Sequence, residues 1–185
     1  MWMWSVDRLG PDVPMTHWLL HSSYLGRWLC RKKFAAFGPG SAVRPYSYAI
    51  NTSRIFIGAN VIIRPQTVLS AGEEEPGRIT IEDNVLMAPG VQIICDNHKF
   101  SDPSLPIIRQ GYRSPLPVLI QEGAWLGASA IVLPGVTIGR NAVIGAGAVV
   151  VRSIPAFSVA VGNPARVIKN TQGPVAGCAP SREEA

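Results

Sequence analysis

The chain has 185 residues, a net charge of +5, 47% hydrophobic residues and 16% charged residues. This length fits one domain, and the apolar content is sufficient for a hydrophobic core. The apolar runs are too short to span a bilayer, and early charges such as Asp7 and Asp12 argue against a secretory signal. Three cysteines at unrelated spacings predict neither a disulfide framework nor a zinc site, which favours the reducing cytoplasm.

Residues 1–40 are expected to form an N-terminal helical cap. Residues 16–33 predict one amphipathic helix, because apolar residues recur along one face and basic residues follow at the C-terminal end. The residues of the stripe are Leu20, Tyr24, Leu25, Trp28 and Leu29. Such a helix would cover the open end of the domain that follows. A basic amphipathic helix could instead make a peripheral contact with a membrane surface.

A six-residue repeat dominates residues 41–169. An aliphatic residue recurs at every sixth position, and a small or aliphatic residue follows four positions later. The first set is Ile120, Leu126, Val132, Ile138, Ile144 and Val150, and the second is Ala124, Ala130, Val136, Ala142, Ala148 and Ile154. The register returns at Ile57, Val61, Ile63 and Thr67, and again at Ile81, Val85, Met87, Val91 and Ile93. A period of six fits neither a helix nor a plain strand, but it fits a short strand followed by a tight turn.

Three such units make one triangular coil, and stacked coils bury a continuous aliphatic column. Residues 41–56 are expected to form a degenerate first coil. An ordinary β-sandwich is the alternative, but a sandwich does not keep a strict register over six consecutive units.

The register also locates two insertions. From Ile57 to Ile81 there are 24 residues, six more than one 18-residue coil, and from Ile81 to Ile120 there are 39, which is 21 more. The extra segments, residues 70–78 and 98–117, should leave the same corner on successive coils. A structureless loop of about 20 residues inside a compact domain usually carries function.

His98 opens the longer loop, after Asn97 at a position where the repeat calls for a small or apolar inward residue. A break in a local rule is typical of a functional site. An imidazole titrates near neutrality and can take a proton from a hydroxyl group. Cys95 could be considered as a nucleophile, but a cysteine in a β-coil is more often a packing residue.

The pattern aliphatic–small–x–x–small–x resembles the hexapeptide-repeat acyltransferases. The segment from Cys95 to Pro103 resembles the loop of their polysaccharide and sugar O-acetyltransferases and of xenobiotic acetyltransferases. The resemblance implies an all-β fold, a left-handed parallel β-helix with a short N-terminal helix and a protruding loop. The left hand comes from the family alone, since general crossover statistics favour the right hand. It also implies direct transfer from acetyl-CoA, no metal, and a homotrimer with active sites between subunits.

In that family the histidine in the place of His98 is the general base. Asp96, Asn97 and Asp102 are candidates to orient the ring or hold substrate, although turn capping explains the two aspartates equally well. The residues that fall at the family's coenzyme positions are Trp125, Gly127, Ala128, Gly145, Ala146, Arg152, Arg166 and Lys169. The three cations suit the phosphates of CoA. Trp125 could instead pack under the long loop.

The implied acceptor is a sugar hydroxyl of a surface polysaccharide or its precursor. The family's galactoside and maltose enzymes carry an asparagine near the acceptor that the stretch from Thr67 to Ala71 lacks, so an antibiotic hydroxyl is the near alternative. A non-catalytic assembly subunit is a further alternative. A zinc hydratase on this fold would need three converging histidines, and His17 and His21 fall on the N-terminal helix. No nucleic-acid partner is expected, and residues 170–185 are expected to be a flexible tail.

Overall fold

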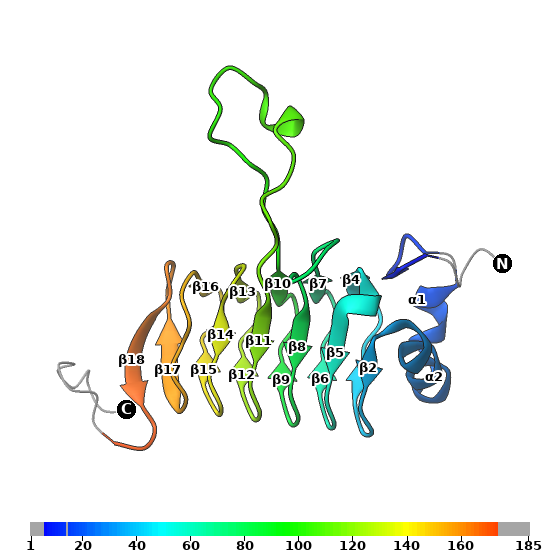
Figure 1. The fold of residues 1–185 in the computed structure, drawn as a ribbon. Coiled ribbons are helices and arrows are strands. Elements are labelled where there is room, and N and C mark those ends of the chain that lie inside the picture. Colours follow the sequence, from blue (N-terminus) through cyan, green and yellow to red (C-terminus); the bar gives the residue numbers. More distant parts are fainter. Residues whose placement is uncertain (1–5, 14, 174–185) are drawn as a thin grey trace.

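The computed structural model describes residues 6–13 and 15–173. The chain winds into a parallel β-helix with two helices at one end, a pair of longer strands at the other, and one long arm that projects from the side (Figure 1). Each coil adds one short strand to each of three sheets. The β-helix confirms the fold class that the six-residue repeat predicts.

The three sheets are named here A, B and C, and their strands follow one another along the axis. Sheet A contains β1 (Arg8–Leu9), β4 (Tyr48–Ile50), β7 (Val68–Ser70), β10 (Gln92–Ile94), β13 (Ile131–Val132) and β16 (Val149–Val150). Sheet B contains β2 (Ala36–Phe37), β5 (Ile55–Ile57), β8 (Ile79–Ile81), β11 (Val118–Ile120) and β14 (Thr137–Ile138). Sheet C contains β3 (Ala42–Val43), β6 (Ile62–Ile63), β9 (Leu86–Met87), β12 (Trp125–Leu126), β15 (Val143–Ile144), β17 (Ser158–Val161) and β18 (Arg166–Asn170).

The six-spaced residues are stacked one above another as the register predicts. Ile120 pairs with Ile81 on one side and Ile138 on the other, and all three are almost completely buried. The small residues four positions later are buried too, including Ala124 and Ala148. One aliphatic column therefore runs through the coils, and its apolar burial is the main stabilising contribution.

Only glycine and asparagine occupy five stacked positions at the corner between sheets B and C, where the backbone adopts positive φ. The stack contains Gly40, Asn60, Asn84, Gly123 and Asn141, with φ between 51° and 75°. The Asn60 side-chain amide donates to the Asn84 Oδ1 at 3.2 Å. A Cβ on Gly123 would lie 2.0 Å from the Asn141 Oδ1. Asparagine tolerates this left-handed conformation, and glycine serves where the neighbouring side chain leaves no room.

Both insertions leave the corner between sheets A and B, as expected. Residues 71–78 connect β7 to β8, and residues 95–117 connect β10 to β11. The two loops touch, because a Cβ on either Gly72 or Gly77 would lie within 2.5 Å of the Pro115 Cβ. The longer insertion forms the arm, which carries a short 3₁₀ turn, η2 (Ile107–Arg109).

The N-terminal cap differs from the single helix that the sequence predicts. It contains α1 (Thr16–Leu19) and α2 (Ser23–Lys33), because Ser22 accepts a hydrogen bond from the Leu25 backbone N–H and starts a new helix. The prediction of the packing face is wrong for most of the stripe. Leu20 and Leu29 are buried, but Tyr24, Leu25 and Trp28 are exposed.

The buried side of α2 includes two small residues. Gly26 and Cys30, one turn apart, are buried beside Leu29, and the Gly26 Cα faces the Leu20 backbone. The lack of a side chain at Gly26 lets α2 approach the backbone of Leu19 and Leu20 closely, and α2 also contacts β2 and β3 of the first coil. Small residues thus occupy part of the packing face of α2, whereas the large aromatic residues Tyr24 and Trp28 are exposed to solvent.

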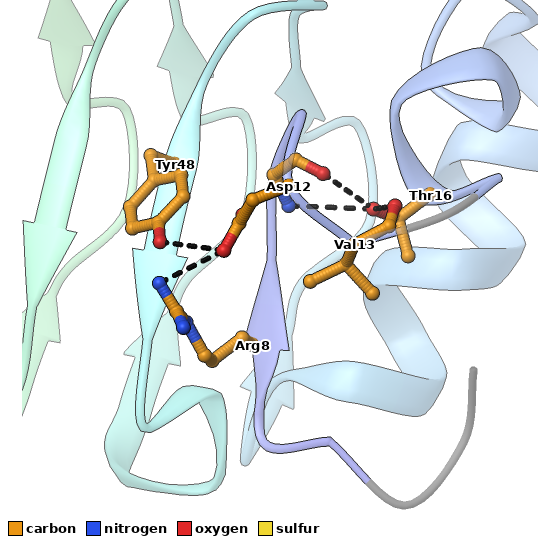
Figure 2. Close-up of polar contacts among 6 residues, drawn as sticks. Arg8, Asp12, Val13, Thr16 and Tyr48 are labelled. Carbon is orange, nitrogen blue, oxygen red and sulfur yellow. Dashed lines mark hydrogen bonds and ion pairs between the residues drawn. The ribbon is translucent and has the colours of Figure 1, made fainter. Parts of the chain in front are cut away.

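The segment before α1 is fastened to the first coil, which the sequence did not indicate (Figure 2). Strand β1 pairs antiparallel with β4. Asp12 accepts a hydrogen bond from the Tyr48 hydroxyl at 2.8 Å and pairs with Arg8 at 2.9 Å. The buried Thr16 hydroxyl contacts the carbonyl oxygens of Gly10 and Val13, both at 2.9 Å.

The first coil begins earlier than predicted, since β2 already pairs with β5 from Ala36. A short 3₁₀ turn, η1 (Thr52–Arg54), joins the first coil to the second. At the other end β18 turns back antiparallel to β17 and ends at Asn170. Most of the predicted tail, from residue 174, lies outside the described residues. Within the described part of the chain, no helix has the length and apolar character needed to cross a membrane.

Candidate active site

His98 lies at the base of the arm, where the outgoing and returning segments are joined. Its backbone forms an antiparallel bridge with Tyr112, and the two rings stack with centroids 4.2 Å apart. Beside this bridge the Lys99 N–H donates to the Gly111 carbonyl at 2.9 Å, and the Arg113 N–H donates to the Asn97 carbonyl at 2.8 Å. The imidazole is therefore exposed but held by a local ribbon.

Asp96 precedes this ribbon and shares a cavity with both insertions. The cavity has a volume of about 230 Å³ and is lined by Glu73, Glu74, Asp96, Tyr112, Arg113 and Pro115. Burial raises the pKa of Asp96 and the charge of Glu73 raises it further, while His98 acts in the opposite direction. The structure thus brings the Asp96 carboxylate into electrostatic contact with the predicted base.

Asp102 lies farther along the arm and is engaged in a turn. Its carboxylate accepts hydrogen bonds from the Ser104 N–H at 2.9 Å and the Ser104 hydroxyl at 2.6 Å, and these bonds lower its pKa. The turn-capping explanation of this residue accounts for its contacts. A role in holding substrate stays a prediction.

Asn97 is exposed, so the repeat is interrupted at this position, where its register would call for an inward residue. The last inward residue before the arm is Cys95, which is fully buried, and its thiol donates to the Arg78 carbonyl at 3.5 Å. Burial raises the pKa of the Cys95 thiol to about 12. A protonated, enclosed thiol is a poor nucleophile, which supports its packing role.

A second cavity, of about 240 Å³, runs beneath the arm on the same side of the prism. It is lined by Cys95, Asp96, Asn97, Arg113, Ser114, Leu116, Leu133, Pro134 and Val151. Its floor is the corner between sheets A and B of the next two coils. The exposed Arg152 directly follows one of these lining residues.

The four small residues predicted to line the coenzyme channel come together in two stacked turns. Gly127–Ala128 and Gly145–Ala146 follow β12 and β15, and the Gly147 N–H donates to the Ala128 carbonyl at 2.8 Å. A Cβ on Gly127 would lie 2.6 Å from the Ala146 nitrogen, so only glycine fits there. Ala128 and Ala146 are exposed, which leaves a strip of accessible backbone along this edge.

The larger coenzyme candidates lie nearby on sheet C. Trp125 is 49% exposed on β12 and is neighboured by Leu86, which points outward from β9. Because the arm leaves another corner, Trp125 does not pack under the arm of its own chain. Arg166 and Lys169 are exposed on β18, opposite Val161 and Val159.

The two halves of the predicted site lie on different edges of the prism. His98 leaves the corner between sheets A and B, whereas the turns after β12 and β15 form the corner between sheets C and A. One chain by itself therefore does not bring the histidine onto its own stacked turns. His17 and His21 lie in the cap beside Tyr46, and the described residues contain no group of three side chains suited to hold a metal ion.

Sequence reasoning missed Tyr112 and Arg113 as neighbours of His98. The hexapeptide register stops at the arm and gives no information about which residue of the returning segment meets the outgoing one. The available signal in the sequence was the aromatic residue Tyr112, which lies outside the six-residue repeat and so could not be aligned with His98.

Comparison with known proteins identifies the family of this β-helix. Residues 117–152 match the family model described as bacterial transferase hexapeptide (six repeats). A maltose O-acetyltransferase structure from Clostridium difficile is 34% identical with a TM-score of 0.72, covering 80% of this chain and 76% of that one. The chain belongs to the hexapeptide-repeat acetyltransferase family. A galactoside acetyltransferase in complex with coenzyme A, 32% identical with a TM-score of 0.70, covers 83% of this chain and 75% of its own.

Among curated proteins, a galactoside O-acetyltransferase from Escherichia coli is 35% identical over 141 residues, which is 76% of this chain. The matched region spans 66% of the length of that relative. For acetyltransferase relatives from Saccharomyces cerevisiae and Schizosaccharomyces pombe, it spans 61% and 44% of their lengths, respectively. The family is thus established for the β-helix, while the chain covers less than two thirds of these relatives.

Proposed function

We propose that this hexapeptide-repeat protein transfers an acetyl group from acetyl-CoA to a hydroxyl of a carbohydrate acceptor. The observation that carries the proposal is the exposed imidazole of His98, held at the base of the arm on a β-helix that resembles two sugar O-acetyltransferases. The Escherichia coli relative is named for the same reaction type.

The chemistry proposed for His98 is general base catalysis with direct transfer. The imidazole takes the proton of the acceptor hydroxyl as its oxygen attacks the thioester carbonyl carbon. The carbon–sulfur bond then breaks, and the imidazolium returns the proton to the leaving thiolate. A positioned base of this kind contributes roughly 10²–10⁴-fold. The stack on Tyr112 would limit the ring to few orientations, and the negative charge of Asp96 would favour the imidazolium form.

The stacked turns are proposed to hold the coenzyme. Their exposed backbone at Ala128 and Ala146 can hydrogen-bond an extended pantetheine arm, and Arg166 and Lys169 can pair with the phosphates of the coenzyme. Arg152 lies at the corner between sheets A and B, so it would reach these phosphates from a second copy of the chain. These residues supply binding and orientation, whereas the reactive thioester belongs to the coenzyme.

The active unit is proposed to be a homotrimer with sites between subunits. His98 and the stacked turns lie on different edges of one chain, so a second copy must complete each site. Two exposed apolar surfaces support such an assembly. One is the arm, with Phe100, Leu105, Ile107, Ile108, Tyr112 and Leu116, and the other is the outer face of sheet C, with Ile62, Leu86 and Trp125.

The catalytic proposal is tested by comparing His98→Ala with Lys99→Ala, its exposed neighbour in the sequence. Thiol release from acetyl-CoA should fall at least a hundredfold in the histidine variant and stay near wild type in the lysine variant. Sedimentation should show the same assembly for both. Wild-type turnover in His98→Ala would refute the role of the imidazole.

The acceptor is tested by a screen of nucleotide sugars, oligosaccharides and antibiotics under the same thiol assay. Acetylation of a sugar or oligosaccharide would support the surface-polysaccharide assignment. Acetylation of an antibiotic alone would replace it with the xenobiotic function. If CoA does not bind and no thiol is released, the protein is an assembly subunit and the enzymatic proposal is wrong.

A further inference from the structure

The capped end of the β-helix has a one-sided charge distribution. No aspartate or glutamate occurs between Asp12 and Glu73, while the same stretch contains seven lysines and arginines. Two of these have partners in the fold, since Arg54 pairs with Glu75 and Lys33 donates to the Val6 carbonyl. The stretch comprises the cap and the first two coils, at one end of the prism (Figure 1). Asp7 and Asp12 lie at the same end, but lysines and arginines outnumber them, so this end carries an excess of positive charge.

The outward side of α2 combines these cations with apolar groups. Tyr24 is 73% exposed, and Arg27 and Arg31 follow it at helical spacing on the same side. Leu25 and Lys32 are also exposed beside them. A helix that presents aromatic and aliphatic side chains among cations is typical of the interface between a membrane and water.

A second aromatic group extends this face from α1. Trp18 is 75% exposed, although Thr16, two residues earlier, is completely buried and anchors the helix to the segment before it (Figure 2). The Trp18 ring lies 6.3 Å from the His21 ring, which in turn lies 6.1 Å from Tyr46. Because its side chain is mostly exposed, Trp18 contributes little to the hydrophobic core of this chain.

A cavity joins the helix to the first coil on this face. Its volume is about 370 Å³, and the polar groups at its wall include His21, Ser22, Arg27 and Arg44. The wall also contains the first residues of the 11-residue α2, whose dipole favours an anion. Two arginines above such a cavity match the charge of a phosphate-bearing headgroup.

We propose that this cap surface, formed by Trp18, Tyr24, Arg27, Arg31, Lys32 and Arg44, docks onto a bilayer containing anionic phospholipid. The cations meet the lipid phosphates, and the two aromatic rings enter the headgroup layer. The protein would lie on the membrane, with the prism standing away from it. Exposed Tyr24 and Leu25 favour a lipid surface over a nucleic acid, because a phosphate backbone alone offers no apolar layer to receive them.

The test is vesicle flotation of the full chain. Vesicles of phosphatidylcholine with phosphatidylglycerol should carry the protein upward, vesicles of phosphatidylcholine alone should not, and added salt should weaken the binding. The triple variant Arg27→Gln, Arg31→Gln, Lys32→Gln should lower the vesicle affinity on the order of a hundredfold. The double variant Trp18→Ser, Tyr24→Ser should lower it independently of salt.

The matched control is Lys99→Gln, Arg109→Gln, Arg140→Gln, which removes the same charge from exposed positions outside the cap. Equal losses in the two triple variants would mean that net charge alone acts, and would overturn the proposal. So would the absence of flotation with either vesicle, or duplex DNA binding without vesicle binding. Thiol release with a water-soluble acceptor should be unchanged in the cap triple variant, which separates this proposal from the catalytic one.

Discussion

The coils and the arm of this protein are built on opposite principles. In the coils, apolar side chains point inward at every repeat, and residues such as Ile120 and Leu126 are fully buried. In the arm, the apolar side chains point outward, and Ile108 is 84% exposed. The coils pair their backbone groups along the axis, whereas the two segments of the arm are joined by a few hydrogen bonds near His98 and Tyr112 and by the Gln110 side chain, which bonds Asp102.

The difference shows which part of the chain is self-sufficient. A coil satisfies its hydrogen bonds and buries its apolar residues against the coils above and below. The arm exposes apolar residues that a monomer rarely leaves in contact with water. The coils thus carry the stability of the fold, and the arm carries apolar surface suited to a second copy.

Replacing one isoleucine in each region gives the sharpest test of this comparison. Ile120→Ala should lower the free energy of unfolding by about 2–5 kcal/mol, because it removes a buried side chain and leaves a cavity. Ile108→Ala should change it by less than about 0.5 kcal/mol. Urea unfolding of both variants, at protein concentrations low enough to dissociate oligomers, measures the two values. Equal losses would show that the arm contributes to the fold of a single chain.

The N-terminal segment should behave as part of the coils. Burial acts to raise the pKa of Asp7, but hydrogen bonds from Ser53 and Thr52 outweigh it, so the pKa lies below its usual value. The folded state then binds fewer protons than the unfolded state. The stabilisation is present above the ordinary aspartate pKa of about 4 and is lost as the pH falls through the folded value.

Asp7→Asn should therefore cost about 1 kcal/mol at neutral pH, a value reduced because the carboxylate is partly exposed to solvent. Urea unfolding of the variant and the wild type at pH 7 and pH 3 measures the difference, which should shrink at the lower pH. A difference that does not depend on pH would show that the charge of Asp7 has no part in holding the segment. Asp12→Asn, in the neighbouring contact with Tyr48, serves as a comparison.

The sequence predicted the coils well because their physics is periodic. The inward positions, the corner of the insertions and the stacked turns at Gly127 and Gly145 all follow from one register that repeats along the chain. The start of the first coil at Ala36 was missed because its strand has no earlier coil to define the repeat. The prediction of the buried face of α2 failed because it considered only hydrophobic residues. The structure also buries Gly26 and Cys30, whose small size permits close packing.

The candidate site was predictable only up to the point where the register stops. His98 was found by its place at the start of the insertion, but its neighbours depend on how the arm returns. The stack on Tyr112 and the cavity shared with Glu73 arise from contacts between residues far apart in the sequence. The sequence located the break in the repeat at Asn97, and in the structure the chain leaves the coil two residues earlier, after the buried Cys95.

The ribbon at the base of the arm can be tested through Tyr112. Tyr112→Leu should lower kcat about three- to tenfold, because an aromatic pair contributes on the order of 0.5–1.5 kcal/mol to holding the ring. Tyr112→Phe keeps the stack and should restore kcat. Steady-state kinetics with acetyl-CoA separates this effect from a change in KM. If Tyr112→Phe is as slow as Tyr112→Leu, the hydroxyl group and not the stack is what matters.

The smallest expected effect concerns the contact between the two insertions. Glu73 and Asp96 line the same cavity, and the negative charge of Glu73 contributes to the raised pKa of Asp96 after the larger effect of burial. Glu73→Gln removes that charge without changing the size of the side chain, so the pKa of Asp96 should fall toward its usual value. Carboxyl-carbon NMR titration of Asp96 measures the shift, with Glu75→Gln as the control because Glu75 is outside the cavity lining and pairs with Arg54. An unchanged titration would mean that the short loop and the arm do not form one electrostatic unit, and that the arm alone sets the environment of His98.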